Sequence, residues 1–318
     1  MRILVTGSAG HLGEALMRTL RDSEHEPIGI DVLASPFTDI VGSIVDRETV
    51  RRTMHGIDAV LHSATLHKPH VATHRSQDFV DVNVTGTLNL LEEAAHAHVR
   101  AFVFTSTTSA FGRALTPAPG GPAAWLTEDI TPVPKNIYGV TKVAAENLCE
   151  LAQRNTGMPC LILRTSRFFP EDDDLPAVRD ARADANNKAN EFLYRRVDIE
   201  DVVDAHLLAI EKAPALGFAR YIVSATSPFT RADLAGLRRD APAVVKRHVP
   251  AYAAEYARHG WTMFDSIDRV YDNAKARAEL GWRPRHDFAS VIERLGSSDD
   301  VRSPLAQAVG SKGYHRTA

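Results

Sequence analysis

Three glycines spaced by three residues follow the first apolar run of the chain, and they restrict its fold more than any other feature. Gly7, Gly10 and Gly13 stand directly after the aliphatic segment 3–6 and before a segment with helical periodicity over 12–20. A strand, a tight glycine turn and a helix in this order begin a β-α-β unit, because glycine permits the turn and the close packing of helix on strand. The free N–H groups at such a helix N-terminus bind a pyrophosphate, so the segment predicts a dinucleotide site.

An aspartate ends the second predicted strand. Asp31 closes the run 27–31 and stands 24 residues after Gly7. A carboxylate at this position accepts hydrogen bonds from the adenosine ribose hydroxyls and repels a 2′-phosphate. The sequence therefore predicts a site that takes NAD rather than NADP.

Short aliphatic runs alternate with helical segments along the first half of the chain. The clearest helix is predicted over 77–98. Its apolar residues recur every three or four positions, at Val80, Val84, Leu88, Leu91 and Ala95. The predicted strands are 3–6, 27–31, 59–64, 102–105 and 161–163. This alternation predicts an α/β fold with a doubly wound parallel sheet, the Rossmann architecture.

The composition changes from residue 113 onward. Residues 113–136 hold five prolines and predict a long surface loop. The polar segment 170–190 is expected to leave the sheet for a smaller second region, with the acidic run 171–174 as a solvated face. Helical periodicity returns at 197–210, a further strand is predicted at 220–224, and the last 25 residues show no strong pattern.

These segments divide the 318 residues into two parts. Residues 1–168 are expected to form the NAD-binding Rossmann domain. Residues 169–318 are expected to form a mainly substrate-binding region, from which segments near 197–224 return to the Rossmann domain.

Charge and apolar patterning exclude several partners. The formal net charge of −3 gives no long-range field that would attract nucleic acid. The chain has neither an N-terminal apolar core typical of a signal peptide nor a run of 18 apolar residues, so we expect a cytoplasmic protein without a membrane partner. The two cysteines, Cys149 and Cys160, fit neither a disulfide framework nor a metal site and are expected to be buried or idle thiols.

A tyrosine and a lysine four residues apart open another predicted helix. Tyr138 and Lys142 then lie on one face, one above the other. A phenol is a poor base at neutral pH, but a neighbouring ammonium and a positive nicotinamide ring both favour the phenolate. Tyr138 is therefore a candidate base that takes a proton from a hydroxyl while hydride leaves the same carbon. Without other motifs, the pair is equally compatible with an exposed tyrosine beside an exposed lysine.

The remaining motifs support the catalytic interpretation. The strand 58–64, the helix start Asn83-Val-Thr-Gly-Thr87, the segment 105–112 and Leu280-Gly-Trp282 follow the glycine turn in order. With Tyr138 and Lys142, the sequence resembles the extended short-chain dehydrogenase/reductase family, in its NAD-dependent epimerase/dehydratase branch, and the nucleotide-sugar 4-epimerases in particular. The resemblance covers residues 1 to about 168 and resumes at 197–208 and 272–284.

The resemblance implies roles for individual residues. Thr107 matches the hydroxyl that hydrogen-bonds the reacting oxygen, with Ser106 as the alternative, and Lys142 would also bind the nicotinamide ribose. Asn83 would lie near the cofactor and support the local backbone, while Ser43 occupies a position that is usually an aspartate. The expected cofactor residues are Gly7, Gly10, His11, Leu12, Gly13, Asp31, Ser43, Ile44, Ser63, Ala64, Asn83, Thr105, Tyr138, Lys142 and Thr165.

Departures from the family pattern concern the substrate. Thr108 and Ser109 stand where the sugar dehydratases have an Asp-Glu pair, which argues against dehydration. Arg167 replaces the usual asparagine after the strand ending near 164, and only about thirty residues separate it from 196–201. A short substrate region with an arginine suits a compact anionic sugar, because a guanidinium pairs with carboxylate or phosphate. Alternatively, Arg167 pairs with an acid of the run 171–174.

A group of histidines follows the strand 59–64. His62, His67, His70 and His74 lack a metal-ligand spacing, so we predict no metal and expect histidines that face solvent or substrate. His67 and Thr108 join Thr107 and Arg167 as the expected substrate residues.

Three functions remain open on sequence alone. The first is an NAD-dependent sugar or nucleotide-sugar epimerase that works through a keto intermediate. The second is a dehydrogenase of a free sugar, uronate or other small anionic polyol that releases NADH. The third, a non-catalytic NAD sensor, is disfavoured because Tyr138 and Lys142 are both present. The resemblance also implies a homodimer formed by the helices at 77–98 and 138–154.

Overall fold

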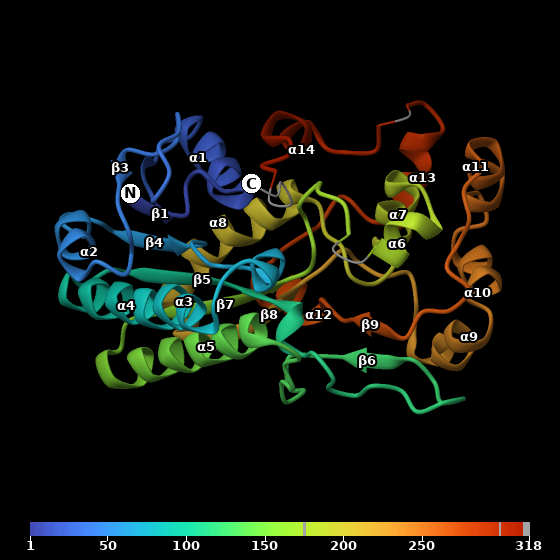
Figure 1. The fold of residues 1–318 in the computed structure, drawn as a ribbon, viewed down its shortest axis with the longest axis horizontal. Coiled ribbons are helices and arrows are strands. Elements are labelled where there is room, and N and C mark those ends of the chain that lie inside the picture. The colour runs from blue at the N-terminus through green and yellow to red at the C-terminus, as the bar shows by residue number, and fades with distance from the viewer. Residues whose placement is uncertain (174–175, 299, 314–318) are drawn as a thin grey trace.

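The computed structural model describes residues 1–173, 176–298 and 300–313, and a seven-stranded parallel sheet forms its centre (Figure 1). The strand order β3-β2-β1-β4-β5-β7-β8 reverses direction at β1, so the predicted doubly wound Rossmann sheet is confirmed. The strands are β1 (Arg2–Thr6), β2 (Glu26–Asp31), β3 (Ile40–Val41), β4 (Ala59–His62), β5 (Ala101–Thr107), β7 (Cys160–Thr165) and β8 (Phe218–Val223).

Helices cover both faces of this sheet (Figure 1). Alternate residues of the buried strands point to opposite faces, so Ile3 and Val5 join one core while Leu4 joins the other. The first core is closed by α1 (His11–Arg21), α8 (Ile199–Leu216) and α14 (Pro304–Val309). The second is closed by α2 (Arg47–Thr53), α4 (Gly86–His96) and α5 (Ile137–Thr156), and it buries both cysteine thiols as expected.

The helix predicted over 77–98 is present, but only part of its predicted apolar face is buried. It consists of α3 (Ser76–Val80), a π-helical segment η2 (Asp81–Thr85) and α4. A π turn holds more residues than an α turn and shifts the side chains that follow it around the axis. Val80, before this segment, and Leu88, after it, are 36% and 38% exposed, whereas Phe79, Leu90 and the predicted Leu91 are buried.

A second region beside the sheet has its own apolar core, which unites α7 with the helices after β8. Its helices are α6 (Pro176–Ala181), α7 (Asp184–Glu191), η4 (Arg231–Asp233), α9 (Leu234–Arg239), α10 (Ala241–His248), α11 (Tyr252–His259) and α13 (Phe288–Leu295). Between the two cores, β6 (Ala124–Leu126) pairs in parallel with β9 (Arg269–Tyr271). The loop prediction for 113–136 is thus wrong at 124–126, because only a partner strand 145 residues later turns that segment into a strand. The remaining elements are η1 (Lys68–Ala72), η3 (Thr108–Ala110) and α12 (Ala274–Glu279).

The acidic run is not the solvated face that was expected. Glu171 and Asp173 are buried, Asp172 is exposed, and Asp174 lies outside the described residues. Glu171 accepts hydrogen bonds from the amide of Lys312 and from the Ser311 hydroxyl. The carboxylate therefore holds the C-terminal segment in place.

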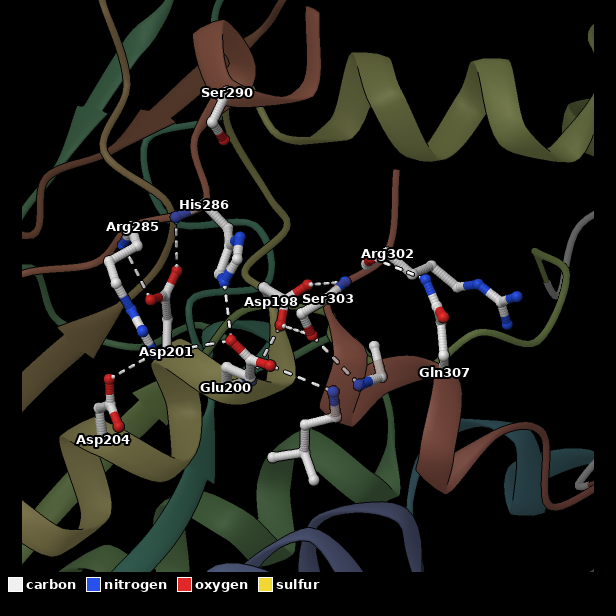
Figure 2. Close-up of polar contacts among 12 residues, drawn as sticks. Asp198, Glu200, Asp201, Asp204, Arg285, His286, Ser290, Arg302, Ser303 and Gln307 are labelled. Atoms are coloured by element: carbon white, nitrogen blue, oxygen red, sulfur yellow. Dashed lines mark hydrogen bonds and ion pairs between the residues drawn. The ribbon is translucent and has the colours of Figure 1, made fainter. Parts of the chain in front are cut away.

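Polar contacts at the start of α8 anchor the segments that return from the second region (Figure 2). Asp201 accepts the backbone N–H groups of Arg285 and His286 at 2.8 and 2.9 Å. Asp198, the N-cap of α8, accepts the Ser303 hydroxyl at 2.6 Å. Carboxylates at a helix N-terminus are favourable to the helix dipole, so these contacts join α8, the approach to α13 and α14 at one point.

Across the described part of the chain, no helix combines the length and the apolar character needed to cross a membrane.

Candidate active site

A cavity of about 1010 Å³ opens at the carboxyl ends of the central strands. In doubly wound sheets ligands bind at this edge, where the strand order reverses. Of the residues predicted for the cofactor, it is lined by Gly7, Gly10, His11, Leu12, Gly13, Asp31, Ser43, Ile44, Ser63, Ala64, Thr105, Tyr138, Lys142 and Thr165. Of those predicted for the substrate, it is lined by His67, Thr107, Thr108 and Arg167.

The glycine turn forms a cradle that side chains would fill. Gly7 has a φ of +73°, and a Cβ there would lie 2.8 Å from the Cα of Ala64. A Cβ on Gly13 would lie 1.9 Å from the carbonyl oxygen of Gly7. The turn leads into α1, whose N-cap is Gly10, so the helix N-terminus stands at the cavity wall. This geometry fits the pyrophosphate of a dinucleotide.

Asp31 is held in a defined orientation at the end of β2. Its Oδ2 accepts the Ala9 N–H at 3.0 Å and its Oδ1 accepts the Leu33 N–H at 2.9 Å. The carboxylate thus links the strand to the glycine turn while it lines the cavity. Ser43 and Ile44 line the same end, and the Ser43 hydroxyl accepts the Val45 N–H.

Tyr138, Lys142 and Thr107 meet at the centre of the cavity. Asn136 caps α5 by accepting the Gly139 N–H, which places Tyr138 in the first turn with Lys142 one turn later. The ammonium nitrogen of Lys142 donates to the Thr105 carbonyl at 2.6 Å, at the end of β5. Thr107 hydrogen-bonds Tyr138, and its Oγ1 also accepts the Ser109 N–H at 3.0 Å.

Burial controls the protonation of this pair. Burial raises the pKa of Tyr138 to about 12, although the hydrogen bond with Thr107 acts to lower it. Burial lowers the pKa of Lys142 to about 7, and the charge on Glu146 opposes that shift. Lys142 also lies against the Phe104 ring, 4.0 Å from its centroid. The expectation that Lys142 lowers the phenol pKa is therefore wrong for the protein's own groups, because desolvation is the largest effect on both.

The structure distinguishes Thr107 from its alternative, Ser106. The Ser106 hydroxyl donates to Glu146 at 2.6 Å, and Glu146 is in turn bound by the buried guanidinium of Arg164 at 2.7 Å. Ser106 therefore belongs to a buried ion-pair network beneath the cavity. Thr107 is the hydroxyl that contacts Tyr138.

Asn83 does not lie where a cofactor would touch it. It is 2% exposed beneath the cavity wall. Its Oδ1 accepts the Leu66 N–H, and its Nδ2 donates to the Leu66 carbonyl and the Thr141 hydroxyl. The prediction of a cofactor contact is corrected. Asn83 instead joins the segment after β4 to α5, which agrees with its second expected role, support of the local backbone.

Arg167 is engaged by internal acids. Its Nη1 contacts the Asp173 carboxylate at 2.5 Å and Glu191 at 3.2 Å. The alternative interpretation from the sequence, pairing within the run 171–174, is the arrangement observed. Arg167 still borders the cavity, but both of these carboxylates already neutralise its charge.

The histidines separate into two groups. His62 is fully buried and hydrogen-bonded to Thr6 and Thr87, so it is a core residue. The rings of His67, His70 and His74 lie edge to face or tilted along η1 and border the cavity. Within the described ranges, no three histidine, cysteine, aspartate or glutamate side chains are placed to hold a metal ion.

Several cavity residues were not predicted from the sequence. Tyr194 and Arg195 follow α7, Asp268, Arg269 and Tyr271 lie at β9, and Lys312 comes from the C-terminal segment. These segments have no periodicity or motif, and long-range pairing alone brings them to the cavity. The adjacent arginines Arg195 and Arg196, only about thirty residues after Arg167, were the one available signal.

Comparisons with known proteins agree with this geometry. The model of the NAD dependent epimerase/dehydratase family matches residues 3–218. The UDP-glucose 4-epimerase of Rhizobium meliloti is 27% identical over 92% of this chain and 94% of its own length. The mitochondrial L-threonine 3-dehydrogenase of Sus scrofa is 27% identical over 96% of this chain and 85% of its own.

Solved structures share the fold. An NAD-bound short-chain dehydrogenase/reductase superfamily protein from Agrobacterium tumefaciens superposes with a TM-score of 0.66 at 24% identity, covering 93% of this chain and 96% of the other. The UDP-Glc/GlcNAc 4-epimerase of Campylobacter jejuni superposes with a TM-score of 0.68 at 18% identity, covering 92% and 97%. The family match extends over more than half of the chain, and the sheet, the glycine cradle and the tyrosine-lysine helix all accord with it. The chain belongs to the NAD dependent epimerase/dehydratase family and is an enzyme of the extended short-chain dehydrogenase/reductase type.

Proposed function

We propose that this enzyme oxidises a hydroxyl of a sugar or nucleotide sugar to a ketone with NAD, and that Tyr138 is the base. The observation that carries the proposal is the meeting of Tyr138, Thr107 and Lys142 in the cavity that also contains the glycine cradle. A base, a hydroxyl donor and a dinucleotide cradle are the groups that this chemistry needs.

NAD would lie along the cofactor end of the cavity. Its pyrophosphate fits the turn at Gly7, Gly10 and Gly13, and its adenosine ribose fits Asp31. Ser43, Ile44, Ser63, Ala64, Thr105 and Thr165 complete that wall. When bound, NAD accepts hydride from the substrate carbon and brings a positively charged ring close to the phenol.

Two side chains of the protein would act on the proton of the substrate hydroxyl. Thr107 hydrogen-bonds the substrate oxygen beside Tyr138, and the phenolate of Tyr138 takes the hydroxyl proton as the C–O bond becomes a carbonyl. Because burial raises the pKa of Tyr138 to about 12, the phenolate requires positive charge nearby. The positively charged nicotinamide ring of bound NAD would supply that charge.

The ketone admits two outcomes. Return of the hydride to the opposite face gives an epimer, and this outcome is favoured by the UDP-glucose 4-epimerases among the relatives. Release of NADH gives a dehydrogenase, and this alternative is favoured by the L-threonine 3-dehydrogenase relatives and by the short segment between Arg167 and Arg196. Thr108 and Ser109 offer no acid for dehydration.

The test is an assay of the purified protein. It is denatured and the supernatant is assayed for NAD(H); native protein is then offered NAD⁺ with sugars, uronates and UDP-sugars. Bound NAD(H) with sugar interconversion and no accumulated NADH supports the epimerase. An empty site with substrate-dependent NADH production supports the dehydrogenase. Unchanged turnover by Tyr138→Phe would exclude Tyr138 as the base. No turnover of any compound, together with full biological activity of Tyr138→Phe, would favour the NAD sensor.

The two parts of the chain would bind different molecules. Residues 1–168, with 197–224, would bind NAD, and the rest of 169–318 would form the substrate wall. Apolar side chains are exposed on α3, α4 and α5 at Val80, Leu88, Val140 and Leu151. Since large exposed apolar side chains on neighbouring helices suit a second copy, we include a homodimer in the proposal.

A further inference from the structure

The substrate end of the cavity is rich in positive charge. Among the described residues that line the whole cavity, seven are lysine or arginine and two are aspartate. Asp31, Lys142 and the glycine turn belong to the cofactor end. Beyond Tyr138 the wall includes Arg195, Arg269 and Asp268. The pyrophosphate of NAD does not account for arginines at that end.

One group of charges there joins three arginines to two acids. Glu191 contacts the guanidinium groups of Arg195 and Arg196, each at 2.8 Å, and Arg167 at 3.2 Å. Burial acts to raise the pKa of Glu191, but the three arginines hold it below its usual value, so the carboxylate is charged. Asp173 supplies the second negative charge. Three guanidinium groups therefore share these two carboxylates in direct ion pairs.

Arg195 is the member of this group that faces the cavity with bonding capacity left. Its side chain is one-third exposed, and it stacks on the Tyr194 ring. Its Nε–H is buried and has no hydrogen-bond partner among the described residues. The exposed third of the side chain, rather than the buried Nε–H, is the part that an anionic oxygen in the cavity could contact.

Arg269 is fixed by long contacts on β9. Its Nε lies 3.3 Å from Asp268 and its Nη1 lies 3.3 Å from the Gly112 carbonyl. Charge-assisted hydrogen bonds are normally about 2.7–2.9 Å, so neither contact uses the guanidinium fully. The Asp268 side chain is also 43% exposed, so solvent weakens its ion pair with Arg269. The Arg269 side chain is only 11% exposed.

Arg269 shares the cavity wall with the proposed reacting group. Arg269, Tyr271 and Thr108 all line the cavity, and Thr108 follows Thr107, to which we assign the reacting oxygen. Burial raises the pKa of Tyr271, whereas the side chains of Arg269 and Thr108 both act to lower it, so the three lie close together. An anionic group on the sugar itself is therefore within the part of the cavity that Arg269 borders.

We infer that the substrate is a sugar acid or sugar phosphate, and that Arg269 and Arg195 bind its carboxylate or phosphate. Arg167, whose charge is already neutralised by internal acids, holds this wall together instead. The inference rests on the proposed function, since it places the anion relative to Thr107 and Tyr138. It makes Arg269 a specificity-determining residue.

The test compares Arg269→Gln with the wild type on glucuronate, glucose 6-phosphate, glucose and UDP-glucose. We expect the wild type to favour glucuronate or glucose 6-phosphate over glucose by at least tenfold in kcat/KM. Arg269→Gln is expected to lower that preference by about 10- to 100-fold, mainly through KM, because it removes a charged hydrogen-bond donor. Arg269→Lys is expected to recover part of it. Arg51→Gln, which removes an exposed arginine on α2, is the matched control.

Binding is measured separately from turnover. The thermal stabilisation of the NAD-loaded Tyr138→Phe protein by each compound reports recognition without chemistry. We expect glucuronate or glucose 6-phosphate to stabilise it more than glucose does, and Arg269→Gln to abolish the difference. Stronger stabilisation by glucuronate would identify the anion as a carboxylate, and stronger stabilisation by glucose 6-phosphate would identify it as a phosphate.

Three results would overturn the inference. The wild type could use or bind anionic and neutral sugars equally well, or Arg269→Gln could lower kcat/KM equally for both. The wild type could also prefer UDP-glucose, with Arg269→Gln lowering that preference by the 10- to 100-fold expected for the sugar acid or sugar phosphate. Each leaves the proposed function intact. Full turnover by Tyr138→Phe would instead overturn the proposed function, and the binding measurement would still decide the inference.

Discussion

Burial shifts the pKa values of two active-site groups in opposite directions. Desolvation disfavours the charged form of each, so the phenol of Tyr138 becomes a weaker acid and the ammonium of Lys142 a stronger one. The sequence predicts which residues form the pair, since a spacing of four places them together. It does not predict these directions, because burial by β5 and the bond to the Thr105 carbonyl are tertiary features.

Replacement of Tyr138 tests the base directly. Tyr138→Phe removes only the hydroxyl, and we expect kcat to fall by about 10²–10⁴-fold, the range typical of general bases. NAD affinity, measured by calorimetry, is expected to stay within about twofold. Thr107→Val is expected to lower kcat less. A Tyr138→Phe enzyme with wild-type kcat would exclude the assignment.

His206 gives the fold a predictable pH dependence. Its Nε2 meets the Thr105 hydroxyl and its Nδ1 the Val202 carbonyl, and burial lowers its pKa to about 4. Between pH 6.5 and 4 the unfolded chain binds a proton that the folded protein does not. The free energy of unfolding should therefore fall by about 3 kcal/mol as the pH drops through this window, then level off below it.

Urea unfolding at several pH values measures this effect. His206→Gln is expected to have a flatter dependence between pH 6.5 and 4 than the wild type, whatever its absolute stability. His55→Gln, at an exposed position, is the control and should follow the wild-type slope. An unchanged slope in His206→Gln would show that other groups cause the pH dependence.

At the scale of elements, the glycine turn shows how a local pattern determines a site. The order of strand, glycines and helix is short-range, so the sequence predicts the cradle fully. Gly13→Ala is expected to destabilise the fold by about 1–3 kcal/mol, because its Cβ would meet the Gly7 carbonyl, and to abolish NAD binding. The melting temperature and NAD titration measure the two effects. Normal NAD affinity in this variant would contradict the proposed cradle.

The exposed apolar residues of α3, α4 and α5 predict an association surface. Leu88→Glu combined with Val140→Glu is expected to convert a dimer into monomers, as measured by light scattering after size exclusion. Val41→Glu, at a more exposed position on β3, should leave the mass unchanged. A monomeric wild type would overturn the homodimer. Within 77–98, Leu91 is buried as predicted, whereas Val80 and Leu88 of the same predicted face are exposed.

At the scale of the whole molecule, the sequence predicts the part of the fold that is built from neighbouring segments. Each β-α-β unit carries its own alternation and turn, and the six strands expected from 3–6 to 220–224 all occur in the main sheet. The substrate wall depends instead on partners far apart in the chain. β6 becomes a strand only beside β9, and Arg269 reaches the cavity only through that pairing. Asp201 similarly fixes the approach to α13 from 84 residues away.

The most direct test of the account is turnover by wild-type and Tyr138→Phe enzymes on the same panel of sugars, sugar acids and UDP-sugars with NAD⁺, with epimer formation and NADH absorbance followed together. We expect epimer or NADH from at least one compound in the wild type, and a rate that is lower by about 10²-fold or more in Tyr138→Phe. Equal rates in the two proteins would contradict it.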